Sequence, residues 1–349
     1  MQHSPIAVVT GGTAGIGRAT VDALLDRGYR VAVLARGTRR LEALSRTKGN
    51  RVWTRSVDVG DGAALDRAGD AIVDELGVPD VWVNNAMLTS LSPFAEVDEA
   101  EFRKITDTTY LGTVNGCRTA LRIMARGNIV NVGSGLAYAS IPNQAAYCGA
   151  KHAIEGFTQS LRIELAQARR PITLSMVQLP AVNTPQFDWS RNRMDRKQQP
   201  APPIFQPEVA AAGVMKAIDG HAREILVGRS VLQLMVANML FPTIVERKLT
   251  KIGTDIQTSE RPDRPRLDNL DSPVEDYPGT SHGPYDDRAA PRGMVVDGDA
   301  ARAVFVAGGV AALLAAGLLL GRATASRKRG PRPLARPRAT PAYLRPAGL

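Results

Sequence analysis

Residues 6–27 read IAVVTGGTAGIGRATVDALLDR, and this stretch decides the fold. The apolar run from Ile6 to Thr10 predicts a short buried strand. A glycine-rich turn follows at 11–17, and apolar residues at helical spacing then predict a helix from Arg18 to Arg27. Glycines let the backbone approach a pyrophosphate, which the positive end of the following helix attracts. The stretch therefore predicts a phosphate-binding turn, although such a turn can also be purely structural.

The chain as far as about residue 230 alternates short apolar runs with helical patterns. Further strands are predicted at 30–35, 51–59, 80–86, 128–133, 172–179 and 224–228. Further helices are predicted at 63–76, 102–126, 144–168 and 207–220. This alternation predicts an α/β fold with a doubly wound, mostly parallel, seven-stranded sheet and helices on both faces.

Arginines follow the second predicted strand. In a dinucleotide-binding sheet, residues at this position contact the 2′ position of the adenosine ribose. Arg36 ends that strand, Arg39 and Arg40 lie close by, and no acid is present there. An NAD site usually offers an acid to the ribose 2′-hydroxyl, whereas an NADP site offers an arginine to the 2′-phosphate. The arginines favour NADP, unless they form only a solvated helix start.

A second motif, SGLAYASIPNQAAYCGAK, occupies residues 134–151. Its alanines predict a helix from Gln144 onward, which places Tyr147 and Lys151 one turn apart on one face. A cation beside a phenol lowers the phenol's pKa, and such a tyrosine can exchange a proton with a carbonyl or alcohol oxygen. Ser134 could hold the same oxygen. Taken alone, the tyrosine and the lysine could equally be an ordinary surface pair.

Taken together, the motifs resemble the short-chain dehydrogenase/reductase family over about residues 5–230. The resemblance is carried by Thr10-Gly11-x-x-x-Gly15-x-Gly17, Asp58-Val59, Asn84-Asn85-Ala86, and Ser134 followed thirteen residues later by Tyr147-x-x-x-Lys151. The Rossmann-type fold of that family matches the predicted sheet. The alanine- and arginine-rich composition fits a bacterial member, here with a C-terminal hydrophobic extension.

The resemblance implies roles for individual residues. Tyr147 would be the general acid/base, Lys151 would lower its pKa and hold the nicotinamide ribose, and Ser134 would orient the substrate oxygen. The cofactor, NADP(H) by preference with NAD(H) as the alternative, would contact Gly11, Thr13, Gly15, Ile16, Gly17, Arg36, Asp58, Val59, Asn85, Ala86, Tyr147, Lys151, Pro180, Val182 and Thr184.

Two residues depart from the family pattern. Thr109 stands where the family has an asparagine that holds a proton-relay water, so a modified relay is expected around this threonine. Met87 replaces the glycine that usually ends Asn-Asn-Ala-Gly, which puts the local backbone conformation in question.

Charge and cysteine content exclude several classes of protein. The formal net charge is +10, but eight basic residues and no acid follow Gly321, so the preceding chain carries about +2. A nucleic-acid-binding surface on the folded part is therefore not expected. Cys117 and Cys148 lack metal-ligand spacing, so no zinc site or disulfide framework is expected. No signal peptide is recognised at the N-terminus, and the catalytic domain is expected in the cytoplasm.

The catalytic domain is predicted to span 1–230, with a substrate loop at 186–206. The apolar residues of this loop could contact a lipophilic substrate or simply pack on the domain; they are Phe187, Trp189, Met194, Ile204 and Phe205. An apolar extension at 231–253 is interpreted as an added packed helix, with a membrane-contacting helix as the alternative.

Beyond the extension, residues 254–302 are rich in Pro, Asp, Arg and Gly, which predicts a disordered linker. The uncharged segment 303–321 would span about 28 Å as a helix, so it is predicted to be a transmembrane or interfacial helix. A basic disordered tail is expected at 322–349, where it would favour anionic lipid. A buried or aggregating helix is the alternative for the apolar segment.

The leading hypothesis is an NADP(H)-dependent oxidoreductase acting on a carbonyl or secondary alcohol of lipophilic character. The alternative is a non-catalytic NADP(H)-binding regulator or membrane scaffold with the same fold, for which Thr109 would be the sign. A homodimer or homotetramer is implied by the resemblance alone.

Overall fold

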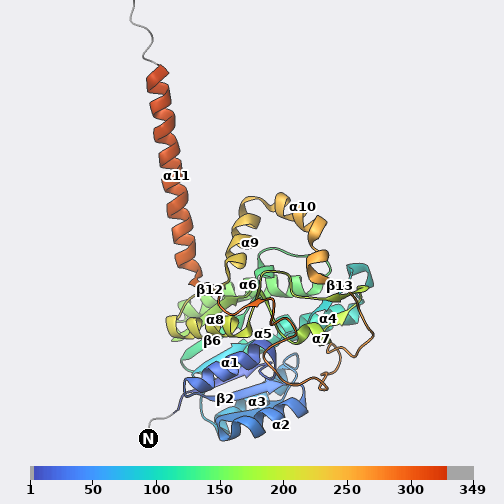
Figure 1. Cartoon of the computed structure of the whole chain (residues 1–349). Helices are drawn as coiled ribbons and strands as arrows, with labels where there is room; N and C mark the ends of the chain where they lie inside the picture. The colour runs from blue at the N-terminus through green and yellow to red at the C-terminus, as the bar shows by residue number, and fades with distance from the viewer. Residues whose placement is uncertain (1–3, 328–349) are drawn as a thin grey trace, which may run out of the picture. The chain divides into compact units, whose positions relative to one another are not determined.

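The computed structural model describes residues 4–327, and within its last helix the side chains of 311–314 and 317–327 lie outside the described residues. The chain divides into two compact units, with the boundary between Asp299 and Ala300. The first unit is an α/β domain built around one large sheet (Figure 1).

The central sheet has eight strands in the order β15-β12-β7-β6-β4-β1-β2-β3. Seven run parallel, as predicted, and β15 pairs antiparallel with β12 at one edge. Buried apolar side chains occupy the strands on both faces, as helix-covered parallel strands require. The strands are β1 Ile6–Thr10, β2 Arg30–Ala35, β3 Val52–Ser56, β4 Val81–Asn84, β6 Gly127–Val132, β7 Ile172–Gln178, β12 Glu224–Val227 and β15 Val295–Asp297.

Helices cover both faces of the sheet and form two apolar cores. The first core joins the sheet to α1 Gly15–Asp26, α2 Thr38–Lys48 and α8 Pro207–Gly220. The second joins it to α3 Gly62–Glu75, α5 Gly112–Ile123 and α6 Ala145–Gln167. A π-helical turn, η3 Asp107–Leu111, separates α5 from α4 Glu99–Thr106. The single helix predicted over 102–126 is therefore three segments.

Short strands and helices complete the first unit. β10 Arg196–Gln198 pairs with β13 Thr258–Pro262, and β5 Ser90–Leu91 pairs with β9 Arg191–Asn192. A three-stranded sheet has the order β14-β11-β8. Its strands are β8 Ala181–Val182, β11 Ile204–Phe205 and β14 Ala289–Ala290.

A buried polar network lies between β4 and β6. Asn84 Nδ2 donates to Asn131 Oδ1 at 2.9 Å, and Trp82 Nε1 donates to Asn84 Oδ1 at 2.8 Å. Asn131 Nδ2 donates to Thr158 Oγ1 of α6 at 2.9 Å. Partners of this kind are needed because an unpaired buried amide would be costly. Asn84 thus joins β4 to β6 and, through Cys117 Sγ at 3.4 Å, to α5.

The substrate loop predicted at 186–206 contains α7 Gln186–Trp189, and most of its large apolar residues are packed. Trp189 and Ile204 are buried, Phe205 belongs to the first apolar core, and the Phe187 ring packs edge-on against Tyr285. These contacts favour the packing alternative over direct contact with a lipophilic substrate.

Residues 231–253 lie in two helices, α9 Arg229–Leu240 and α10 Pro242–Ile252. Val231 is buried, so α9 is fixed to the domain at its start. Met239, Phe241 and Ile244 are exposed. The packed helix of the sequence-based interpretation is thus partly buried along α9 and largely exposed from Met239 through α10.

Residues 254–302 differ from the expected disordered linker. They carry β13, β14 and β15, each paired with a strand of the catalytic domain. Backbone pairing and ion pairs order this segment, and neither depends on the apolar content that was used to predict disorder.

The second unit contains most of α11 Gly298–Arg327, which includes the predicted membrane segment 303–321. Across the part of the chain that the structure describes, no helix combines the length and the apolar character needed to cross a membrane. The structure therefore gives the transmembrane prediction no support. Much of the predicted basic tail, residues 328–349, lies outside the described residues.

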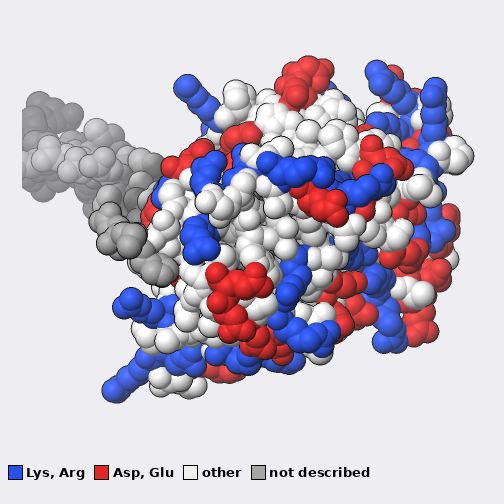
Figure 2. Space-filling model, turned by 90° about the horizontal axis from the view of Figure 1, so that it is seen from below, with Lys and Arg blue, Asp and Glu red and all other residues white. Residues whose placement is uncertain are grey.

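Basic and acidic side chains are mixed on the face of the domain shown in Figure 2. Lysine and arginine side chains alternate there with aspartate and glutamate. Several charged side chains of the domain are paired, for example Arg122 with Asp70 at 2.6 Å and Arg27 with Asp219 at 2.6 Å. Such mixed surfaces do not concentrate the positive field that nucleic acids need.

Gly116 of α5 allows the helix to approach the buried amide network, which yields a stability prediction. A Cβ at Gly116 would collide with Asn84 and lie 2.8 Å from its Cγ, whereas a Cβ at Gly156 of α6 meets no atom within 4 Å. We expect Gly116→Ala to lower the free energy of unfolding by about 1–3 kcal/mol. Gly156→Ala should raise it by about 0.4–1 kcal/mol. Urea unfolding followed by circular dichroism measures both, and equal effects would contradict the close approach.

Candidate active site

The carboxyl ends of β1 and β4 form the glycine turn and its support. Asn85 Nδ2 donates to the carbonyls of Thr10 and Gly11 at 3.0 and 3.2 Å. Thr10 Oγ1 in turn accepts the backbone N–H groups of Asn85 and Ala86. Gly11 has φ of +67°, and a Cβ there would lie 2.9 Å from Ala86 Cα. Glycine is therefore needed both for the backbone conformation and for the space.

A cleft opens along this edge of the sheet and encloses about 1100 Å³, counting its space open to solvent. Its walls hold the start of α1, the ends of β2 and β4, and the segment after β8. Most of the predicted cofactor-binding residues line it, namely Gly11, Thr13, Gly15, Ile16, Gly17, Arg36, Asp58, Val59, Asn85, Ala86 and Thr184. A helix N-terminus beside glycine amides suits a phosphate group, so these residues fit a dinucleotide.

Pro180 and Val182 are not among the described residues that line the cleft. Val182 is buried in β8, where it pairs with Phe205 of β11. Pro180 lies near Gly228, whose Cβ would be 3.3 Å from Pro180 Cγ. The structure thus gives both residues packing contacts behind the cleft.

Asp58 is held at the cleft wall by two donors. Its carboxylate accepts from Lys104 Nζ at 2.8 Å and from the Gly60 N–H at 3.0 Å. Burial raises the pKa of Asp58, but the bonds from Lys104 and Gly60 outweigh burial and leave that pKa below its usual value. Asp58 is therefore a fixed anion at neutral pH.

Ser134 follows β6, and a residue absent from the sequence-based site holds it in place. The Gln178 side chain accepts the Ser134 N–H at 2.9 Å and donates to Glu155 at 2.7 Å. Ser134 Oγ accepts the Leu136 N–H at 3.1 Å. Gln178 is fully buried at the end of β7. The one available signal was a side-chain amide in the mostly apolar run ITLSMVQL.

The structure brings Ser134, Tyr147 and Lys151 together at the start of α6. Ser134 lies close enough to the Tyr147 phenol to influence its pKa, and Lys151 Nζ lies 5.5 Å from the centroid of the Tyr147 ring. Lys151 is buried and donates to the Val132 carbonyl at 2.7 Å. None of the three lines the described cleft, but Thr89 of its wall donates to Gln144 just before α6.

The pKa of Tyr147 differs from the expectation of a lowered value. Burial raises the pKa of this phenol and outweighs the polar influence of nearby Ser134, which lowers that pKa. Burial also lowers the pKa of Lys151 to about 8. The site therefore desolvates both groups, and this effect outweighs the activation by a neighbouring charge expected from the sequence.

Thr109 is buried in the π-helical turn η3, and its polar atoms are largely engaged. Its hydroxyl donates to the Leu88 carbonyl at 2.9 Å and accepts the Leu88 N–H at 3.0 Å. Its carbonyl accepts the Thr113 hydroxyl at 3.0 Å. The two bonds to Leu88 thus hold the backbone directly after Met87. Residues with positive φ, other than glycine, among those described are Asn143, Arg169 and His221, so Met87 has an ordinary backbone.

Comparison with known proteins agrees with this geometry. A family model described as short chain dehydrogenase matches residues 5–195. An uncharacterized oxidoreductase, YxnA of Bacillus subtilis, is 28% identical over 75% of this chain and 76% of its own length. The 3-oxoacyl-[acyl-carrier-protein] reductase FabG of Haemophilus influenzae is 32% identical over 49% of this chain and 72% of its own length.

Among solved structures, a short-chain dehydrogenase from Streptomyces avermitilis superposes with a TM-score of 0.62 and 25% identity. The match covers 73% of this chain and 98% of that structure. The predicted Rossmann-type fold is therefore confirmed. Family model, relatives and fold agree, and the chain belongs to the short-chain dehydrogenase family of oxidoreductases, which binds NAD(P)(H).

Proposed function

We propose that this chain transfers a hydride between a nicotinamide cofactor and a carbonyl or secondary alcohol carbon, with Tyr147 as the general acid/base. The observation that carries the proposal is the grouping of Ser134, Tyr147 and Lys151 around the start of α6, where the Nζ of buried Lys151 lies 5.5 Å from the centroid of the Tyr147 ring. The nicotinamide, when bound, supplies or accepts the hydride. The remaining steps belong to the side chains of this chain.

Tyr147 suits the role of proton donor to a substrate carbonyl oxygen. Burial raises the pKa of its phenol, so the protonated form predominates at neutral pH. Ser134, held by Gln178, can orient the same oxygen by hydrogen bonding. This state of the phenol supports carbonyl reduction as the favoured direction.

Lys151 and Thr109 would serve the proton transfer from behind. The buried ammonium of Lys151 stabilises negative charge that develops on the phenol. Thr109 keeps one hydroxyl lone pair beyond its two bonds to Leu88, so a water could still bind there. The Thr109 carbonyl already accepts the Thr113 hydroxyl. We therefore propose a modified relay in which the water binds the Thr109 hydroxyl instead of this carbonyl.

Replacing Tyr147 tests the proposal directly. We expect Tyr147→Phe to lower kcat for ketone and aldehyde reduction by about 10²–10⁴-fold because the proton donor is removed. NADPH binding, followed by titration of protein fluorescence, should persist. Tyr29→Phe, which removes a hydroxyl far along the sheet, is the matched control. Tight cofactor binding by the wild type with no turnover on any carbonyl would instead favour a non-catalytic regulator.

The pKa of Lys151 predicts a pH dependence. Because burial lowers this pKa to about 8, the ammonium is charged below pH 8 and loses its proton as the pH rises through that value. We expect kcat/KM for reduction to fall above about pH 8. Lys151→Arg stays charged and should abolish this decline, whatever its absolute activity. A decline that is unchanged in the arginine variant would assign the titration to another group.

We propose NADP(H) as the preferred cofactor on the strength of Arg36. Its guanidinium lines the cleft at the end of β2, where a 2′-phosphate would lie. Arg36→Leu should therefore lower the ratio of NADPH to NADH affinity by about 10–100-fold. Arg46→Leu is the matched control, because Arg46 is exposed on α2 and is not among the described residues that line the cleft. Isothermal titration with both cofactors measures the ratio, and an unchanged ratio would remove the basis for NADP.

For the substrate, we propose a carbonyl compound with an apolar portion. The start of α9 packs near the serine, since a Cβ at Gly135 would lie 3.4 Å from Val231 and 3.7 Å from Leu234. FabG, a reductase of 3-oxoacyl chains by its name, offers a precedent for an apolar substrate portion. We also propose a dimer or tetramer paired through α6 and the helical segment of η3 and α5, where Ile163 of α6 and Leu111 of η3 are exposed.

A further inference from the structure

A segment from the C-terminal half of the first unit crosses the mouth of the cofactor cleft. Residues 268–283, here called the strap, lie between β13 and β14 and contain no helix or strand. Asn269, Pro273 and Val274 of the strap form part of the cleft wall. The strap therefore covers the region in which the adenosine half of a dinucleotide would bind.

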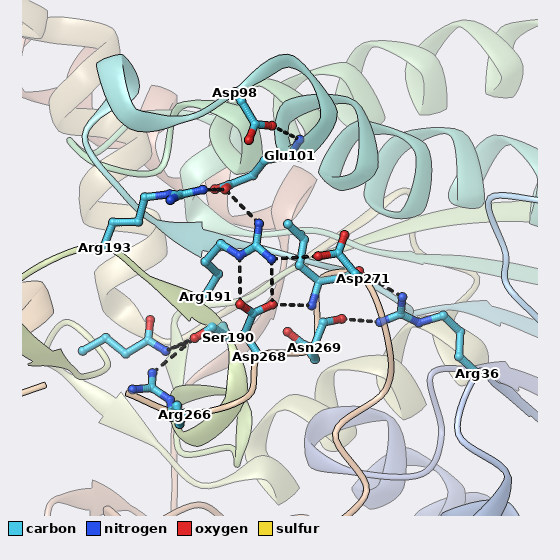
Figure 3. A network of polar contacts seen from close by, with 12 residues as sticks. Arg36, Asp98, Glu101, Ser190, Arg191, Arg193, Arg266, Asp268, Asn269 and Asp271 are labelled. Carbon is cyan, nitrogen blue, oxygen red and sulfur yellow. Dashed lines mark hydrogen bonds and ion pairs between the residues drawn. The ribbon is translucent and has the colours of Figure 1, made fainter. Parts of the chain in front are cut away.

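The strap takes the arginine donors proposed for the 2′-phosphate. Arg36 donates to the carbonyls of Leu270, at 3.1 Å, and Asn269 (Figure 3). Arg40 donates to the carbonyls of Val274 and Tyr277, the latter at 3.2 Å. Neutral carbonyl oxygens thus occupy positions around two cations that a phosphate would fill with stronger, charge-assisted bonds.

The far end of the strap lies on the glycine turn itself. The Gly15 N–H, at the start of α1, donates to the Thr280 carbonyl at 2.9 Å. Arg18 donates to the Gly279 carbonyl at 3.3 Å. The approach is close, because a Cβ at Gly279 would lie 2.7 Å from the Thr13 carbonyl oxygen. One amide of the predicted phosphate-binding turn is therefore already bonded.

We infer that the strap is an autoinhibitory segment that competes with the dinucleotide for Arg36, Arg40 and the glycine turn, and must leave before the cofactor binds. The inference rests on the proposed cofactor site. Each of these donors faces a strap carbonyl, so the strap and the dinucleotide phosphates compete for them. Phosphate brings negative charge that the carbonyls lack, so the cofactor can displace the strap.

Two anchors hold the strap in place. Leu270 is 1% exposed and packs with Leu88, Ile105 and Ala146. Arg191 pairs with Asp268 at 2.9 Å and with Asp271 at 2.8 Å (Figure 3). The same guanidinium contacts buried Glu101 of α4 at 3.2 Å, which fixes it to the domain. These anchors lie at one end of the strap, so releasing them should free the part over the arginines.

One further contact between the strap and the domain is weak. The ion pair of Arg39 with Asp276 joins two largely exposed side chains, 65% and 68% exposed, so it contributes little. The strap also lacks a ladder of backbone bonds that would make it a cooperative element. Local opening of such a segment requires less free energy than unfolding of the sheet.

Replacement of the apolar anchor tests the inference in the full-length protein. We expect Leu270→Ser to lower the Kd for NADPH by about tenfold if the strap is closed in about nine-tenths of molecules. Leu267→Ser is the matched control, because Leu267 is 72% exposed in the neighbouring chain. A Kd that is unchanged or higher in Leu270→Ser would overturn the inference, since a strap that completes the site would weaken binding when released.

A reversible cross-link provides the opposite test. A Cβ at Gly37 would lie 3.3 Å from Glu275 Cγ, which suits a disulfide between cysteines at these positions. We expect oxidised Gly37→Cys/Glu275→Cys to lose NADPH binding and the reduced form to regain it. The two single variants are the controls. Equal binding by the oxidised and reduced forms would show that the closed strap admits the cofactor, which contradicts the inference.

The two tests also separate this inference from the proposed function. Equal NADPH binding in all variants, with turnover by the wild type, would reject the strap and retain the oxidoreductase. A different result would reject the cofactor proposal itself: the wild type, Leu270→Ser and the reduced double variant would all fail to bind NADPH and NADH. The strap could then not be a competitor of the cofactor. Hydrogen exchange should show faster exchange in residues 268–283 when NADPH is added, and unchanged exchange would count against displacement.

Discussion

The junction between β1 and β4 is the constraint on which the cleft depends. Thr10 and Asn85 exchange backbone and side-chain hydrogen bonds across this junction. The bonds fix the glycine turn against the end of β4, at a distance where no side chain could be placed on Gly11. The start of α1, and with it the positive end of the helix, is therefore positioned by two polar side chains on neighbouring strands.

Desolvation dominates the chemistry of the site more than pairwise charge does. Burial raises the pKa of Tyr147, which keeps the phenol protonated, and lowers the pKa of Lys151, which therefore loses its charge at a lower pH. Hydrogen bonds then decide the geometry, since Gln178 fixes Ser134 and the Val132 carbonyl fixes Lys151. An enzyme built in this way depends on buried acceptors, and their positions follow from the strand ends of β6 and β7.

The sequence predicted the sheet, the helices and the motif residues because each has a local pattern. Apolar runs located the seven parallel strands within a few residues, and the spacing of Tyr147 and Lys151 located the turn of α6 that carries them. Gln178 was missed because a single amide in an apolar strand does not reveal its partner. The sequence also did not predict that residues 254–297 are ordered, for a related reason.

That segment is polar and rich in proline, and its partners are distant in sequence. Arg36 lies more than 230 residues from the carbonyls it binds, and Arg191 lies 77 residues from Asp268. No local periodicity encodes such contacts, so composition alone indicated disorder. The pKa shifts of the site also required burial, which depends on packing of the whole domain.

Besides the strap, the region after residue 254 contains β15, which has a separate structural role. It covers the free side of β12, which would otherwise be the exposed edge of the parallel sheet. Exposed edges present unpaired backbone groups and invite association with other chains. The region after residue 254 thus also closes this edge of the sheet, and a chain that ended before β15 would leave the backbone groups of β12 unpaired on that side.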